Sequence, residues 1–218
     1  MRKKLLAAVL ALVMVFTLLP TWAFATDSDS DVAKIGDDGY PTLAEAIEAA
    51  QDGDTVTLLK DAEGAGIIID TSRFATTGLT IDLGNFTYTA TGLPAGSTST
   101  KNQVFQLLKG GNVTIQNGKV AVDGSVSGKF RFVIMNYCDL TLNNVTLDGT
   151  NLGIAENVGE TTDFTSTYVI SNVCGNSTFT DTTIIRPLLR AKRTMPSTWT
   201  IRRRIILLVL RSLCRATA

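Results

Sequence analysis

The chain of 218 residues contains no histidine and only three cysteines, Cys138, Cys174 and Cys214, with no CxxC pair. Zinc sites are normally built from Cys and His ligands, so the sequence excludes a zinc site of that kind. A catalytic triad that uses an imidazole base is excluded for the same reason. In an exported chain, a Cys138–Cys174 disulfide is one arrangement, and buried free thiols are the other.

Acidic residues are absent from residues 182–218, which hold 9 basic side chains. Residues 26–181 hold 20 acidic against 8 basic side chains, a net charge of −12, so the formal charge of zero hides a split. Binding of nucleic acid depends on basic side chains that neutralise phosphates. The acidic body therefore argues against a nucleic-acid partner.

The first 25 residues have the pattern of a signal peptide. A basic segment, Arg2–Lys4, precedes an uncharged apolar run from Leu5 to Leu19, and Ala23-Phe24-Ala25 is typical of a signal-peptidase site. A membrane-spanning helix needs about 20 apolar residues, and this apolar run is shorter. We therefore predict export to the cell surface or the medium, with no stable membrane span after cleavage; an uncleaved anchor is the alternative.

A short capping helix is predicted near residues 42–51. Thr42 followed three residues later by Glu45 forms a capping box, in which each side chain satisfies free backbone groups of the first turn. The apolar positions share one stripe at helical spacing and are Leu43, Ala46, Ile47 and Ala50. An amphipathic helix buries its apolar face against another element. Residues 55–59, which follow it, are predicted to form a strand. Such a helix is expected to cover the first, open turn of a solenoid.

An apolar-Thr-apolar triplet recurs along the chain. Its copies are Val56-Thr57-Leu58, Leu79-Thr80-Ile81, Val113-Thr114-Ile115 and Leu140-Thr141-Leu142, with a degraded copy at Ser177-Thr178-Phe179. The starts lie 23, 34, 27 and 37 residues apart, and repetition at this period is typical of solenoids. Alternate residues of a strand face opposite sides, so the aliphatic residues are predicted to face inward and threonine outward.

A second triplet follows the first in three of these repeats. Asn143-Asn144 separates Leu140-Thr141-Leu142 from Val145-Thr146-Leu147. Asn and Gly accept left-handed backbone conformations at low cost. The sequence therefore predicts a sharp corner at the asparagines, with the two triplets on adjacent faces of one turn.

The chain resembles the right-handed parallel β-helix, or pectin-lyase-like, repeat proteins exported by bacteria. The resemblance rests on TLAEAIEAAQDGDTVTLLKD (42–61), GLTIDLGNFTYTATG (78–92) and DLTLNNVTLDG (139–149), and it covers roughly residues 32–185. It implies an all-β, right-handed parallel β-helix over residues 26–185 with a short N-terminal capping helix. The fold hosts lyases, hydrolases and inert surface proteins, so it does not select a function.

The pattern ends near Ile184, and we predict that the basic tail, residues 186–218, lies outside the fold. One interpretation is a basic arm that binds anionic wall polymer or lipid headgroups. A second is a membrane-seeking helix over residues 201–213. The favoured interpretation is a slipped reading frame or truncation near codon 184, which replaces later repeats with unrelated sequence.

Four residues are candidates for chemistry. Pectin-lyase-like enzymes typically use clustered Asp residues, often with calcium, and an Arg or Lys base. The triplets place Asp123 and Asp148 in equivalent positions after the second strand, where stacked carboxylates suit calcium, and Lys119 or Arg131 suits the base. Each Asp is followed by Gly, a common turn pair, and the turn interpretation is the favoured one.

These observations favour an exported, non-catalytic β-helix module without a cofactor. Its partners are predicted to be polysaccharides, host surfaces or other envelope components, in the manner of an adhesin. One alternative is a carbohydrate-active enzyme, either a polysaccharide lyase or a glycoside hydrolase. The other is a truncated fragment without a function.

Overall fold

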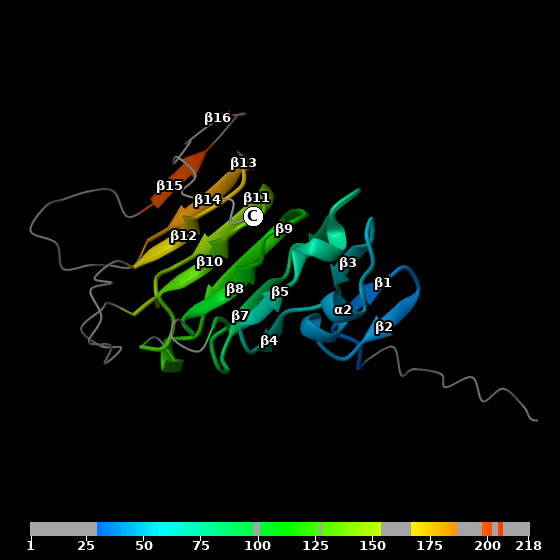
Figure 1. Ribbon diagram of the computed structural model, residues 1–218. Coiled ribbons are helices and arrows are strands. Elements are labelled where there is room, and N and C mark those ends of the chain that lie inside the picture. The colour runs from blue at the N-terminus through cyan, green and yellow to red at the C-terminus, as the bar shows by residue number, and fades with distance from the viewer. Residues whose placement is uncertain are drawn as a thin grey trace, which may run out of the picture.

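The computed structural model describes residues 30–97, 101–126, 128–153 and 167–186, together with the backbone of 198–201 and 205–206. The predicted signal peptide and most of the tail lie outside these residues. In the described part the fold is all-β with one α-helix, as predicted (Figure 1).

Twelve of the strands form one long sheet. Its strands are β1 (Ala33–Ile35), β2 (Asp38–Tyr40), β3 (Thr55–Leu58), β4 (Ala62–Gly64), β6 (Leu79–Asp82), β7 (Thr87–Ala90), β9 (Asn112–Val122), β11 (Asp139–Asp148), β13 (Ser177–Thr180), β14 (Thr182–Ile185), β15 (Thr198–Ile201) and β16 (Ile205–Ile206). The main path runs β15-β14-β11-β9-β6-β3-β1-β2, and β4 and β7 extend it beside β9. From β3 to β14, neighbouring strands pair in parallel.

A second sheet has four strands, all of them parallel. They are β5 (Ile67–Ile69), β8 (Gln103–Leu107), β10 (Phe132–Asn136) and β12 (Tyr168–Asn172), in the order β12-β10-β8-β5. Two short 3-10 turns, η1 (Thr71–Phe74) and η2 (Gly124–Val126), follow strands. The colours in Figure 1 change in sequence order along both sheets, so successive repeats lie side by side.

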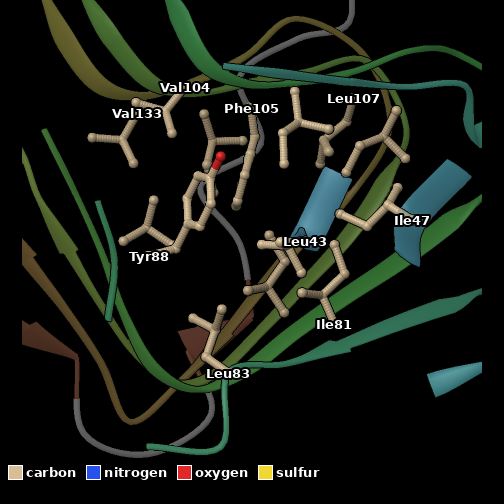
Figure 2. Packing of buried hydrophobic residues seen from close by; sticks show 14 of the residues in the cluster. Leu43, Ile47, Ile81, Leu83, Tyr88, Val104, Phe105, Leu107 and Val133 are labelled. Carbon is tan, nitrogen blue, oxygen red and sulfur yellow. The ribbon is translucent and has the colours of Figure 1, made fainter. Parts of the chain in front are cut away.

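The aliphatic residues of the triplets face one shared core. Leu140, Leu142, Val145 and Leu147 are each at most 2% exposed, which confirms their predicted inward direction. Figure 2 shows the same arrangement around the first repeats, where Ile81 of the long sheet, Phe105 of the second sheet and Leu43 of the helix point toward one another. Both sheets and the helix therefore bury their apolar faces together.

The predicted corners are present. Asn85, Asn117 and Asn144 have φ of 67°, 54° and 54°, in the left-handed region that asparagine tolerates. The Asn144 Nδ2 donates to the Asn117 Oδ1 at 3.3 Å, and the Asn85 N donates to the Asn117 O at 2.7 Å. The corners therefore stack on one another, and β9 and β11 stay paired as they pass through them.

The N-terminal end of the long sheet is closed by a hairpin and by the capping helix, α2 (Leu43–Ala49). The Thr42 Oγ1 accepts from the Glu45 N at 3.1 Å, as predicted, whereas Glu45 Oε1 accepts from the Thr42 hydroxyl at 3.0 Å and not from the cap backbone. All four residues of the predicted apolar stripe are buried. Strand β1 pairs antiparallel with both β2 and β3. No helix in the described ranges is long and apolar enough to cross a membrane.

Two backbone segments of the tail adjoin the other end of the sheet. Strand β15 pairs antiparallel with β14, and β16 pairs antiparallel with β13. The rest of residues 187–218 lies outside the described residues. The expectation that the tail as a whole stands apart from the fold stays a prediction.

Candidate functional site

The predicted stacking of Asp123 and Asp148 is wrong. The β9–β11 register pairs Asp148 with Ala121, so Asp123 lies two residues beyond that position. The cause is Gly118, which pairs with Val145 and takes the place expected for an inward aliphatic residue. A Cβ at Gly118 would lie 2.5 Å from the Leu83 Cβ, so the space is already filled.

Each of the two carboxylates closes its own turn, in agreement with the favoured turn interpretation. The Asp123 Oδ1 accepts from the backbone N of Ser125 at 2.8 Å and from its hydroxyl. These bonds, the hydroxyl first, lower the pKa of Asp123. The Asp148 Oδ1 accepts from the Thr150 N at 3.0 Å. Each carboxylate therefore accepts a hydrogen bond from the backbone N–H two residues further along the chain, just after a strand ends.

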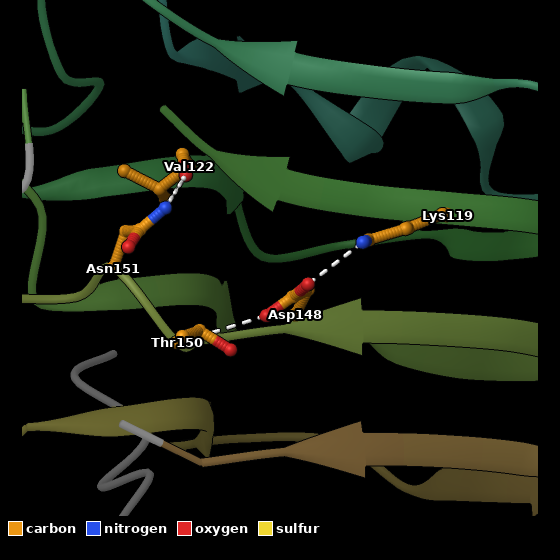
Figure 3. A network of polar contacts seen from close by, with 5 residues as sticks. All are labelled: Lys119, Val122, Asp148, Thr150 and Asn151. Atoms are coloured by element: carbon orange, nitrogen blue, oxygen red, sulfur yellow. Dashed lines mark hydrogen bonds and ion pairs between the residues drawn. The ribbon is translucent and has the colours of Figure 1, made fainter. Parts of the chain in front are cut away.

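Lys119 and Asp148 form an ion pair on the outer side of the long sheet, with Nζ 2.7 Å from Oδ2 (Figure 3). The lysine side chain is 39% exposed and the aspartate side chain 17%. Burial acts to raise the pKa of Asp148, but the hydrogen bonds from Lys119 and Thr150 outweigh it and lower the pKa. The lysine is thus engaged as a donor to a carboxylate, which suits a structural pair better than a general base.

Arg131 is not brought together with the other candidates. It lies immediately before β10 in the second sheet, and its side chain is 1% exposed. Its backbone N donates to the Asn102 O at 2.8 Å, and its O accepts from the Tyr168 N at 3.1 Å. A general base has to reach the proton that it removes. A side chain this deeply buried does not reach a polymer at the surface.

The calcium site predicted at Asp123 and Asp148 stays a prediction. In the described ranges, no three His, Cys, Asp or Glu side chains lie together as metal ligands. Calcium takes six to eight oxygen ligands. The arrangement offers two separated carboxylates that already accept hydrogen bonds, and it therefore gives such a site no support.

Cys138 is a buried free thiol, so the proposed Cys138–Cys174 disulfide is wrong. Burial raises the pKa of Cys138 to about 12. The thiolate is the reactive form of cysteine, and at neutral pH it is scarce here. The Asn136 Oδ1 accepts from the Cys138 backbone N at 3.1 Å, and this bond fixes the backbone at Cys138.

A column of five threonines crosses the outer side of the long sheet. The strand registers align one threonine from each of five strands: Thr55, Thr80, Thr114, Thr141 and Thr178. We call this column the threonine ladder. Neighbouring strands lie about 4.8 Å apart, so the hydroxyls repeat at about that distance. The outward direction of most of these threonines is as predicted, but the first triplet is shifted, because Thr55 and not Thr57 aligns with Thr80.

A second outward column runs parallel to the ladder, two residues further along each strand. Its members are Thr57, Asp82, Gln116, Asn143 and Thr180, and we call it the amide column. Asp82 is the charged member. Its Oδ2 accepts from the Gln116 Nε2 at 2.8 Å and from the Asn117 Nδ2 at 3.1 Å. This carboxylate is therefore held within the corner.

A surface groove of about 450 Å³ borders the ladder at the start of its strands. Its lining comes from four successive segments of the chain: Ala75, residues 109–112, residues 137–139 and residues 174–175. Added Cβ atoms at Gly111 and Gly175 would lie 2.0 Å from backbone oxygens, so the floor of the groove requires glycine. The sequence did not indicate this groove, because it forms only when turns distant in sequence stack.

The described surface thus offers two different outer faces. One carries the ladder, the amide column and the adjoining groove, and the other carries the Lys119–Asp148 pair. Comparisons of the chain with protein-family models, with curated proteins and with solved structures gave no match.

Proposed function

We propose that the described strands form one right-handed parallel β-helix, in which each turn contributes strands to both sheets. The order along the chain supports this, because β5, β8, β10 and β12 of the second sheet alternate with strands of the long sheet. All pairs between successive turns, from β3 to β14, are parallel. Crossovers between parallel strands are right-handed in nearly all proteins.

On this scaffold we propose an exported, non-catalytic module that contacts glycans, host surfaces or other envelope components in the manner of an adhesin. The observation that carries the proposal is the threonine ladder, in which five hydroxyls are held in register on paired strands. A single hydroxyl contributes little in water. Several of them, fixed at a constant spacing, add their contributions without a large cost in ordering.

The enzyme alternative lacks a comparable observation. Asp123 is engaged in a turn, Lys119 and Asp148 are engaged with each other, and Arg131 is buried. A polysaccharide lyase or hydrolase needs an acid or base that reaches the scissile bond. The ladder offers hydroxyls and no such group.

The experiment separates binding from catalysis. The full chain is expressed with and without residues 1–25, and export is followed by fractionation of the culture. The exported protein is then tested for retention on bacterial and host cell surfaces and on immobilised glycans. In parallel it is incubated with uronic acid polymers and neutral glycans, with and without calcium. We expect retention without turnover; calcium-dependent formation of unsaturated product would contradict the non-catalytic function.

A further inference from the structure

We propose that the ligand of the threonine ladder is an extended, uncharged, β-linked polysaccharide that lies across the strands, with about one sugar unit per strand. This inference rests on the proposed function, because it names the ligand of the same surface. It assigns the ladder, the amide column and the groove to one binding site.

The spacing of the ladder supports a polymer with a short, constant repeat. Strands lie about 4.8 Å apart, and each contributes one threonine. Successive sugars of an extended β-linked chain advance by a similar distance, so neighbouring sugars meet equivalent hydroxyls. An α-(1→4)-linked glucan coils and loses this match after a few units.

The side chains of the site match sugar hydroxyls in kind. A threonine hydroxyl both donates and accepts, as a sugar hydroxyl does, and its methyl group offers an apolar contact to the C–H face of a ring. The amides of Gln116 and Asn143 in the amide column each carry an acceptor oxygen and two N–H donors, one of which Gln116 uses on Asp82. Both lie two residues beyond ladder threonines on the same strands.

The charge of the surface favours a neutral polymer over a polyuronate. The ladder has no charged member, and the carboxylate of Asp82 already accepts from amide donors. The groove holds one cation, Lys109, and one anion, Asp139. Residues 26–181 carry a net charge of −12, which repels a polyanion at long range. A neutral chain meets no such barrier.

In this proposal, one side of the polymer lies in the groove that borders the ladder. Asn112 and Asp139 line it and lie two residues before the ladder threonines Thr114 and Thr141, so groove and ladder are continuous. Tyr137 adds an aromatic ring to the lining, and aromatic rings contribute large apolar contact area.

The other outer face provides a matched control. Its corresponding column reads Thr87, Lys119, Thr146 and Thr183, so a charged side chain interrupts it. The column beside it holds Ala121, Asp148 and Ile185. Thr146 and Thr183 have the same intermediate exposure as Thr114 and Thr141, but this face has no uninterrupted hydroxyl column.

The test is isothermal titration calorimetry of the exported chain with oligomers of β-linked glucose, N-acetylglucosamine and mannose, and with oligogalacturonate. We expect the affinity for at least one neutral series to rise with each added unit up to about five, and to be insensitive to salt. The double variant Thr114→Val and Thr141→Val removes two hydroxyls and keeps the β-branch. It should weaken binding roughly tenfold. The double variant Thr146→Val and Thr183→Val should bind as the unchanged chain does.

Both variants are first shown to share the unfolding midpoint of the unchanged chain. Equal loss in the two variants, or tight and salt-sensitive binding of oligogalacturonate, would overturn the inference while leaving a surface-contact function in place. Failure of the chain to bind any glycan or cell surface would defeat the inference and the proposed function together.

Discussion

The two halves of strands β9 and β11 face one core and have different exteriors. Before the corner, the inward residues of β11 are Leu140 and Leu142, and after it they are Val145 and Leu147; all are buried. On the outside, the first half carries the threonine ladder and the amide column. The second half carries the Lys119–Asp148 ion pair and an irregular mixture of side chains.

Core packing restricts the inward residues of both halves but not the outward ones. Packing fixes the interior, because an aliphatic residue removed from either half leaves a cavity. Packing does not fix the exterior, since the outward columns of the second half contain lysine and alanine on β9 and continue to an isoleucine on β14. Core packing therefore does not require the regular outer column of the first half, and this column is the feature that we connect with binding.

The largest expected effect tests the shared interior. Leu142→Ala and Leu147→Ala, one in each half and both 0% exposed, should each lower the free energy of unfolding by about 3 kcal/mol. Urea denaturation measures both. Because both side chains are fully buried, each loss should lie between about 2 and 5 kcal/mol. A loss in one half and none in the other would show that the halves do not share a core.

A smaller effect tests the corner between the halves. Asn144→Ala places a Cβ without a compensating polar group at φ 54° and should lower the free energy of unfolding by about 1 kcal/mol. Asn144→Gly keeps the left-handed conformation at low cost and should stay within about 0.5 kcal/mol of the unchanged chain. Thermal or urea unfolding distinguishes them. If both variants lost the same stability, the side-chain bond to Asn117 would be the cause, and the backbone conformation would not.

The smallest effect concerns the ion pair of the second half. The pKa of Asp148 is lowered in the folded chain, so the pair stabilises the fold above the ordinary carboxyl pKa of about 3.9. That stability is lost as the pH falls through the folded pKa. Asp148→Asn should lower the free energy of unfolding by less than about 1 kcal/mol at neutral pH, because the pair is partly exposed. The difference should vanish in acid; a difference that persisted there would assign the loss to the turn at Thr150.

A large part of the fold was predictable from local sequence patterns. The cap by the Thr42 side chain, the apolar stripe of the helix and the corner at Asn144 were all predictable, because each depends on residues a few positions apart. The inward direction of the aliphatic residues was predictable for the same reason, since alternation is a local property of a strand.

The candidate site was predictable only in part, because it depends on register between distant segments. Gly118 shifts Asp148 away from Asp123 by two residues, and no local pattern shows that Leu83 fills the space. Thr80, Thr114, Thr141 and Thr178 lie at outward positions that the triplets predict, but their alignment and the place of Thr55 depend on register. The burial of Arg131 was hidden because arginine rarely lies in a core. Register would have been needed to find both.

The alignment of the ladder across repeats of unequal length has an evolutionary consequence. Strand pairing, and not the number of residues between strands, fixes where each threonine lies. Insertions and deletions in the connecting segments can therefore accumulate without disturbing the outer face, and duplication of one repeat would lengthen it by a single position. The length of the threonine column can therefore change by one position for each repeat that is gained or lost.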